Sequence, residues 1–255
     1  MNATIRQWPV DTFVLIPSYK SAVTLKTLLP RIQTLVPPRN ICVVDDGSLD
    51  GTNLLCRDFG VHCIAHYSNQ GKGASLWDGF TFLLKNFNAR WIVTMDADGQ
   101  HAIEDVPRFV DCVRKNASAG LCIGMREKAV YKMPISRIFS NCLTSLILSI
   151  LVGQRIMDCQ CGFRIYSKQL LERVVCKYTR FEMESEIILR AAFYRFPIKF
   201  VKVQTLYFNE NSHISHVKDT IRWLRAVIDV WLELHKNKRI PRSPDIKRRK
   251  EMMAN

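Results

Sequence analysis

The chain has 255 residues, of which 47% are hydrophobic and 24% are charged. Both values lie close to those of average globular proteins, which excludes a disordered or fibrous chain and leaves enough apolar mass for one large domain. The 37 Lys and Arg residues outnumber the 23 Asp and Glu residues and give a net charge of +14. Such an excess indicates an anionic partner: nucleic acid, a phosphorylated substrate or an acidic membrane surface.

Short apolar runs alternate with amphipathic stretches along the first two thirds of the chain. The apolar runs predict strands at residues 12–16, 41–44, 61–65, 91–95 and 121–124. The amphipathic stretches predict helices at 52–59, 74–87 and 104–115, preceded by a leucine-rich helix in which Pro30 implies a kink or a later start. Because the strands lack clean alternation and helices separate them, the pattern favours an α/β fold with a parallel sheet covered on both faces.

The last third contains shorter elements and a basic end. Helices are predicted at 168–175 and 182–194, an extended segment at 198–206, and an amphipathic helix at 219–234. Lys and Arg crowd the residues after this helix, which form either a solvated tail or a patch that binds anionic lipid, at about 1 kcal/mol per charge. We therefore predict one domain over 1–216, with the helix and polybasic tail over 217–255.

An uncharged stretch at 138–154 leaves three alternatives open. It forms a buried helix that packs in the protein or between subunits, a helix that lies in the headgroup region of a membrane, or a membrane span. It is shorter than the roughly 20 apolar residues that a span needs, and serine, threonine and asparagine dilute it. The first alternative allows a homo-oligomer.

Cysteine use and the N-terminus indicate the compartment. The nine cysteines include no Cys-x-x-Cys pair, and several stand within apolar runs, so we expect free thiols in a reducing compartment. The first ten residues lack the apolar region of a signal peptide. The predicted location is the cytoplasm, peripherally on the inner face of the membrane.

Polar segments follow the predicted strands where a ligand would bind. In an open parallel sheet, ligands bind beyond the carboxyl ends of the strands. The segments there are Pro17-Ser-Tyr-Lys20, Asp45-Asp-Gly-Ser48, Asn69-Gln-Gly-Lys-Gly-Ala74 and Asp96-Ala-Asp-Gly-Gln-His101. None matches a Walker loop, an EF-hand or the dinucleotide fingerprint G-x-G-x-x-G. They place several carboxylates around one crevice.

Asp96 and Asp98 have the spacing to approach one hard cation where the chain turns after a strand. Mg²⁺ and Mn²⁺ take oxygen ligands and commonly bind a few carboxylates together with substrate phosphates. This pair therefore predicts a site for Mg²⁺ or Mn²⁺.

The four segments together resemble the successive signatures of family-2, inverting glycosyltransferases with the GT-A fold, in order from about residue 12 to residue 211. Further segments resemble the branch of that family that acts on dolichyl or polyprenol phosphate. They are Gly124-Met-Arg126, Arg137-x-x-Ser-Asn141, Asp158-Cys-Gln-Cys-Gly-Phe-Arg164 and Phe181-Glu-Met-Glu-Ser-Glu186. The resemblance implies a Rossmann-like mixed sheet flanked by helices.

The resemblance also implies roles for individual residues. The donor, a nucleoside-diphosphate sugar, would be bound by Pro17, Tyr19, Asp45, Asp46, Lys72, Ala97, Arg126 and Arg137. The divalent metal would be held by Asp96, Asp98 and Gln100, and the acceptor side would be shaped by Asp158, Gly162, Arg164 and Glu182. Lys20 departs from the family pattern, which usually has an acid there, and this puts a base or ribose contact at that position in doubt.

The mechanism that the resemblance implies is metal-assisted transfer with inversion. Asp96 and Asp98 would be catalytic through the metal, which stabilises the departing diphosphate. If the acceptor is a polyprenol phosphate, its oxygen is already anionic and no base is needed. If it is a sugar hydroxyl of an envelope glycan or glycolipid, a carboxylate must take the proton, and Glu184 is the candidate. A nucleic-acid partner is not expected, because the basic residues concentrate in the tail without a recognised DNA or RNA motif.

Overall fold

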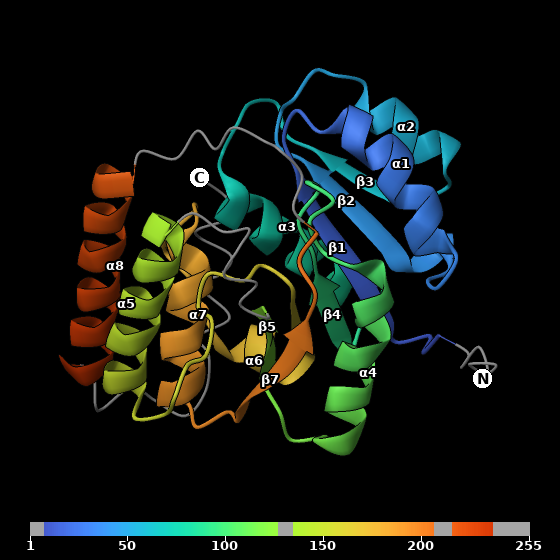
Figure 1. Ribbon diagram of the computed structural model, residues 1–255. Helices are drawn as coiled ribbons and strands as arrows, with labels where there is room; N and C mark the ends of the chain where they lie inside the picture. The colour runs from blue at the N-terminus through green and yellow to red at the C-terminus, as the bar shows by residue number, and fades with distance from the viewer. Residues whose placement is uncertain (1–7, 127–134, 207–215, 237–255) are drawn as a thin grey trace.

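The computed structural model describes residues 8–126, 135–206 and 216–236. These residues form a seven-stranded sheet with helices packed around it (Figure 1). The strands are β1 (Thr12–Ser18), β2 (Ile41–Asp45), β3 (His62–Ala65), β4 (Trp91–Thr94), β5 (Leu121–Arg126), β6 (Arg164–Ser167) and β7 (Ile198–Val203). Their order across the sheet is β3-β2-β1-β4-β6-β5-β7.

The sheet is mixed, which confirms the mixed sheet that the family resemblance implied and corrects the purely parallel sheet that the strand pattern favoured. β6 runs antiparallel between β4 and β5, whereas all the other neighbours pair in parallel. An antiparallel strand begins at the edge where its parallel neighbours end. The residues that lead into β6 therefore join the carboxyl ends of β1, β2 and β4 at one edge of the sheet.

Helices follow most strands, close to their predicted places. They are α1 (Ala22–Gln33), α2 (Thr52–Asp58), α3 (Lys72–Asn86), α4 (Val106–Lys115), α5 (Ile135–Val152), α6 (Lys168–Arg173), α7 (Glu182–Phe193) and α8 (His216–Lys236). α1 begins at Ala22 and contains Pro30, so a start after the proline was wrong. The core is continuous across the sheet and includes fully buried residues of β1 and β2 such as Leu15, Ile16 and Val43.

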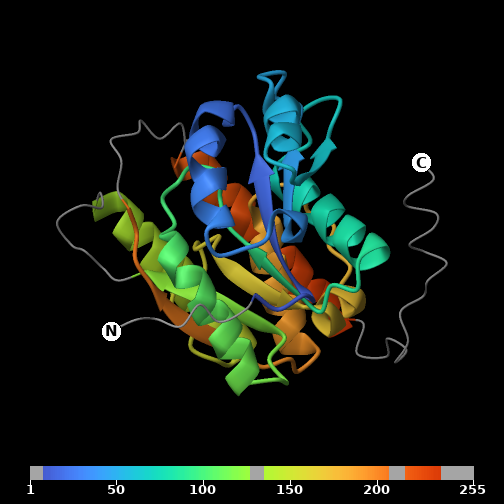
Figure 2. The same ribbon diagram turned by 90° about the vertical axis from the view of Figure 1, so that its right-hand side faces the viewer.

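Three helices stand together on the left of the sheet in Figure 1, and α4 lies on its right; Figure 2 gives the perpendicular view. α7 packs against both α5 and α8. α8 is fixed to α7 by polar contacts as well: Trp223 Nε1 donates to Ser185 Oγ at 2.8 Å, and Arg222 forms an ion pair with Glu182. The boundary that we predicted at residue 216 thus falls at the start of α8, a helix that packs on α7.

No helix in the described part of the chain is both long and apolar enough to cross a membrane. α5 covers most of the uncharged stretch, and it is neither fully buried nor fully exposed. Leu148 is completely buried, whereas 69% of Phe139 and 71% of Ile150 are exposed. All nine cysteines have free thiols, as their sequence context predicted.

Candidate active site

A cavity of about 300 Å³ lies at the edge of the sheet where β1, β2 and β4 end. Of the residues predicted from sequence, it brings together five: Pro17, Tyr19, Asp46, Lys72 and Asp96. Its remaining lining residues are Ser18, Asn69, Gly71, Ser75, Arg180 and Phe181. The polar segments that follow separate strands in the sequence thus share one crevice.

Asp46 is held rigidly on the wall of this cavity. Its Oδ1 accepts hydrogen bonds at 2.8 Å from the backbone N–H of Gln70 and lies 2.8 Å from His66 Nδ1. Its Oδ2 accepts from the N–H of Gly71, also at 2.8 Å. The other ring nitrogen of His66 lies 3.0 Å from Asp78 Oδ2. The loop that precedes α3 is therefore built around the Asp46 carboxylate, which fixes its orientation.

The Asp45 side chain stabilises the turn after β2 and does not line the cavity. Its Oδ1 accepts from the N–H of Ser48 at 3.0 Å and from the Ser48 hydroxyl. Ser48 Oγ in turn accepts from the N–H of Lys20 at 2.9 Å. The loops that follow β1 and β2 are joined in this way, and Lys20 has a φ of 55°. Ala97 is buried and is likewise not a lining residue.

The start of α3 is pressed against the backbone of the segment that leads into α7. A Cβ atom at Gly71 would lie 2.6 Å from the Thr179 carbonyl oxygen, and one at Gly73 would lie 2.6 Å from that of Arg180. Gly71 also has a φ of 102°, which favours glycine. The N–H of Ala74 donates to Thr179 O at 2.9 Å. The two glycines that flank Lys72 thus allow the close contact that directs this lysine into the site.

Lys72 connects two predicted catalytic acids. Its Nζ lies 2.7 Å from Asp96 Oδ1 and 3.1 Å from Glu184 Oε2. Burial alone would lower the pKa of the lysine, but the charges of Asp96 and Glu184 outweigh burial and raise it. Burial likewise raises the pKa of Asp96, and the attraction of Lys72 more than offsets this and brings it to about 2. The three side chains therefore form a charged, mostly buried triad.

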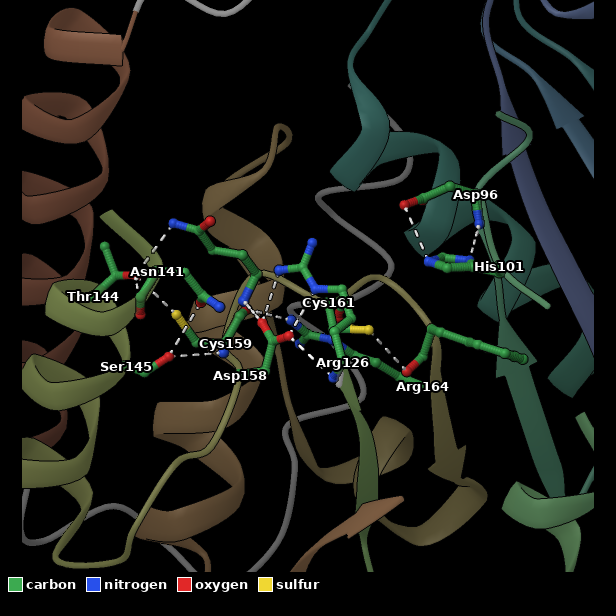
Figure 3. A network of polar contacts seen from close by, with 12 residues as sticks. Asp96, His101, Arg126, Asn141, Thr144, Ser145, Asp158, Cys159, Cys161 and Arg164 are labelled. Carbon is green, nitrogen blue, oxygen red and sulfur yellow. Dashed lines mark hydrogen bonds and ion pairs between the residues drawn. The ribbon is translucent and has the colours of Figure 1, made fainter. Parts of the chain in front are cut away.

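Asp98 and His101 complete the surroundings of Asp96. Burial and then the charge of Asp96 raise the pKa of Asp98, whose Oδ1 accepts from the N–H of Gln100 at 2.9 Å. His101 Nδ1 accepts from the N–H of Asp96 at 3.2 Å, so its proton is on Nε2, which faces Asp96 Oδ2 at 4.0 Å. Figure 3 shows this pair. His101 thus orients the Asp96 segment.

The donor set at Asp96 and Asp98 fits a metal ion that is shared with a substrate. In the described residues, no group of three or more His, Cys, Asp or Glu could hold a metal ion. Mg²⁺, however, usually retains waters and is bound by one or two carboxylates plus substrate phosphates. Two carboxylates two residues apart, one of them on the cavity wall, suit such a site.

The loop before β6 takes part in a second polar network (Figure 3). Asp158 accepts two hydrogen bonds from the Arg126 guanidinium, from Nε at 2.7 Å and from Nη2 at 2.9 Å. Such a bidentate pair fixes the plane of the guanidinium. Arg137 falls in the first turn of α5, and its side chain lies outside the described part.

Arg164 is completely buried, so it does not contact an acceptor directly. Its guanidinium donates to the carbonyl oxygens of Cys161, Glu184 and Cys159 at 2.7, 2.8 and 2.7 Å. It also lies 3.7 Å from Glu184 Oε1. Arg164 thus joins the loop before β6 to the first turn of α7.

The acids of α7 are all buried, and each pairs with a cation. Glu182 and Glu186, four residues apart, share one face of the helix, whereas Glu184 points to another. Glu182 pairs with Arg222, Glu184 with Lys72, and Glu186 with Arg190 at 2.8 Å. Spacing could have indicated only the pair of Glu186 with Arg190, four residues apart on α7, because the other two cations come from α3 and α8.

Gly162 lies directly beneath the contact between Lys72 and Asp96. A Cβ atom there would be 2.6 Å from Asp96 Oδ2 and 2.8 Å from Lys72 Nζ. We expect Gly162→Ala to displace both flexible side chains and to lower the turnover number about 10- to 100-fold, because small misplacements are costly in catalysis. Stability should change by less than about 1 kcal/mol. Initial rates and the thermal midpoint test this; an unchanged turnover number would contradict it.

Several site residues were missed in the sequence. Ser18 stood inside a quoted motif, yet only the structure shows its buried hydroxyl on the cavity wall without a hydrogen-bond partner. Arg180 comes from the segment that packs on α3, next to Phe181, which begins the Phe181–Glu186 segment but had no role assigned to it. A lone hydroxyl or a residue ahead of a helix gives no signal in sequence, because its place depends on contacts between distant segments.

The fold is that of GT-A glycosyltransferases. Glucosyl-3-phosphoglycerate synthase from Mycobacterium tuberculosis, in complex with Mn²⁺, UDP and glucosyl-3-phosphoglycerate, superimposes with a TM-score of 0.67 over 93% of this chain and 87% of that chain at 17% identity. Its structure with Mg²⁺ and UDP gives a TM-score of 0.63. The family model described as "Glycosyl transferase family 2" matches residues 13–175, and the chain belongs to this family.

Several proteins of similar sequence are named as enzymes that act on a polyprenol or dolichyl phosphate. The polyprenol monophosphomannose synthase of Mycolicibacterium smegmatis is 34% identical over 64% of this chain, and the match spans 64% of that enzyme's length. The undecaprenyl-phosphate mannosyltransferase of Micrococcus luteus is 32% identical over 63% of this chain and 68% of its own. The UDP-N-acetylglucosamine–dolichyl-phosphate N-acetylglucosaminyltransferase of Methanococcus voltae is 28% identical over 76% of this chain and 85% of its own.

Proposed function

We propose that this glycosyltransferase moves a sugar, with inversion and the help of Mg²⁺ or Mn²⁺, from a nucleoside-diphosphate sugar to a polyprenol phosphate. The observation that carries the proposal is the cavity itself, which has the clamped Asp46 and the Asp96–Lys72 pair on its wall. Its volume of about 300 Å³ lies in the range of small-ligand sites. The names of the sequence relatives support the acceptor.

The donor nucleotide would lie along the wall formed by β1 and β2. The Asp46 carboxylate is held by the N–H groups of Gln70 and Gly71 and by His66, all from the segment between β3 and α3, and it would accept from an N–H of the base. Pro17 and Tyr19 would flank the base and ribose, and the unpartnered Ser18 hydroxyl offers a further polar contact. A buried hydroxyl without a partner costs stability, so a ligand atom that pairs with it gains affinity.

The sugar leaves the diphosphate near Asp96. Asp96, Asp98 and Gln100 would hold the metal ion, which when bound stabilises the negative charge that develops on the departing diphosphate. Lys72 supplies a positive charge at the same place, and Arg126 has a guanidinium plane fixed by Asp158 that suits a phosphate oxygen. The acceptor oxygen attacks the anomeric carbon from the opposite side and inverts it.

The surroundings of Glu184 favour a phosphate acceptor over a hydroxyl acceptor. One carboxylate oxygen lies 3.1 Å from the ammonium of Lys72, and the other lies 3.7 Å from the guanidinium of Arg164. Protonation of Glu184 during the reaction would break this ion pair. A phosphate oxygen needs no base, so Glu184 would then serve to hold Lys72.

The substitution Glu184→Gln distinguishes the two acceptors. With polyprenol phosphate as acceptor, we expect the variant to keep transfer within about tenfold of wild type, because no proton has to be removed. With a sugar hydroxyl as the true acceptor, a lost base would cost roughly 10²–10⁴-fold. The assay supplies Mn²⁺, a panel of labelled nucleotide sugars, and either polyprenol phosphate or glycolipid acceptors.

The outcome of that assay decides the function as well. Transfer to polyprenol phosphate that stops with a chelator and returns with Mn²⁺ supports the proposal. Transfer only to hydroxyl acceptors, with collapse in Glu184→Gln, replaces it by the alternative. Full activity in the presence of chelator removes the metal from the mechanism.

We further propose that the enzyme binds the membrane surface peripherally through α5 and α8. Each helix exposes an apolar stripe at helical spacing: Phe139, Leu143, Leu146 and Ile150 on α5, and Ile221, Leu224, Ile228 and Leu232 on α8. The basic tail that we predict to bind anionic lipid continues from α8 and lies outside the described residues from 237 onward.

The double variant Phe139→Ser/Ile150→Ser tests this membrane contact. Burying such side chains contributes about 1.5–3 kcal/mol each. We therefore expect the variant to partition at least about tenfold less onto anionic liposomes in co-sedimentation. The matched control is Val23→Ser/Leu49→Ser, which alters two apolar side chains, 87% and 95% exposed, on α1 and in the loop between β2 and α2. Equal binding of both variants would exclude α5 as the contact.

A further inference from the structure

The ammonium group of Lys72 lies beside Asp96, at a place where the predicted metal ion would bind this carboxylate. Its Nζ lies 2.7 Å from Asp96 Oδ1, and only 16% of the lysine side chain is exposed. The second oxygen of Asp96 faces the backbone of Gly162, where even a Cβ atom would be within 2.6 Å. One side of the Asp96 carboxylate is thus occupied by Lys72, and the other is closed by the loop before β6.

The Asp96 carboxylate cannot bind the Lys72 ammonium and a divalent ion at the same time without a loss of affinity for one of them. A metal bound to Asp96 would lie within a few ångströms of Nζ, and two like charges at that distance repel each other strongly in a partly buried site. The backbone of Lys72 cannot retreat, because the glycines beside it pack on Thr179 and Arg180. Only the side chain can move. Glu184, 3.1 Å away, offers it a second anchor.

We propose that Lys72 forms an ion pair with Asp96 in the nucleotide-free enzyme and releases this carboxylate when the metal binds together with the donor. This inference rests on the proposed metal site. In the exchange, Nζ leaves Asp96, keeps Glu184 and turns to the incoming diphosphate, whose negative charge replaces that of Asp96 as its partner. Lys72 therefore acts as a positioning residue that makes metal binding dependent on nucleotide.

Removal of the positive charge of Lys72 should strengthen the binding of Mn²⁺ to the nucleotide-free enzyme. Free enzyme should bind Mn²⁺ weakly, because Lys72 competes for Asp96. Lys72→Met should bind Mn²⁺ at least tenfold more tightly without nucleotide. When a nucleoside diphosphate is present, the gain should disappear or reverse, since the variant lacks the ammonium that would contact the diphosphate. Lys72→Arg, which keeps the charge, should stay close to wild type in nucleotide-free affinity.

The test is a Mn²⁺ titration followed by electron paramagnetic resonance, with and without UDP or GDP. Lys85→Met is the matched control, because it removes a lysine from the other end of the same helix, about 20 Å away. It should leave the affinity within twofold of wild type. A thermal midpoint for each variant confirms that it is folded.

The titrations of Lys72→Met and of wild type distinguish a failure of the exchange at Asp96 from a failure of the metal site itself. Nucleotide-free affinity that is unchanged or weaker in Lys72→Met overturns the inference, even when wild type binds Mn²⁺ together with a nucleotide. Failure of wild type to bind Mn²⁺ under either condition overturns the metal site and the inference together. A tenfold gain in Lys72→Met that Asp96→Asn abolishes supports both.

Discussion

Asp96→Asn is expected to reduce sugar transfer by roughly 10³-fold, the largest loss of activity among the substitutions considered. Asparagine keeps the size of the side chain but removes the charge that would bind the metal and that now holds Lys72 at 2.7 Å. Loss of a single group that stabilises developing charge commonly costs about 10²–10³-fold. Here the same change also frees Lys72 from its partner, so both the metal and the lysine that would stabilise the leaving diphosphate are disturbed.

The measurement is the initial rate of transfer to polyprenol phosphate at saturating nucleotide sugar and Mn²⁺. Asp58→Asn is the matched control, because it makes the same chemical change at an exposed residue at the end of α2 and should leave the rate unchanged. A rate for Asp96→Asn within tenfold of wild type would rule out a central role for this carboxylate.

Arg164→Met is expected to destabilise the protein by about 3–5 kcal/mol. The guanidinium is completely buried and donates to three backbone carbonyl oxygens. Methionine fills similar space but leaves those carbonyls without a donor, and it removes one cation beside Glu184. Breaking a buried charged network by removing one partner costs this much because the remaining polar groups stay out of water.

Urea unfolding followed by tryptophan fluorescence measures the change. Arg155→Met serves as the control, because it removes an exposed arginine from the same connection between α5 and β6, and it should stay within about 0.5 kcal/mol of wild type. Equal midpoints for the two variants would mean that the carbonyl oxygens find other donors when Arg164 is absent.

The sequence was sufficient for the edge of the sheet where the chemistry lies. Strands β1, β2 and β4 end where apolar runs end, and the polar segments that follow them converge because parallel strands share a carboxyl edge. β6 could not be found in the same way. It is only four residues long, and it is recognisable as a strand only through its pairing with β4 and β5.

Contacts between distant segments decide what the motifs alone leave open. Lys72 and Glu184 appeared as separate candidates, one beside a nucleotide and one beside an acceptor, but they form one ion pair because α3 packs on the segment before α7. Asp45 and Asp46 are adjacent in sequence, yet one folds a turn and the other lines the cavity. Pairing and packing of this kind are properties of the folded chain.

The close contact of Gly71 and Gly73 with Thr179 and Arg180 has a consequence for how the enzyme handles two substrates. The same short loop clamps Asp46 through the N–H of Gly71 and carries Lys72 toward Glu184. No side chain separates the two backbones, so a displacement of the loop before α3 would also displace Thr179 and Arg180. A donor that contacts Asp46 and Lys72 would thereby act on the segment that leads into α7 and Glu184, which couples the nucleotide side of the cavity to the predicted acceptor side.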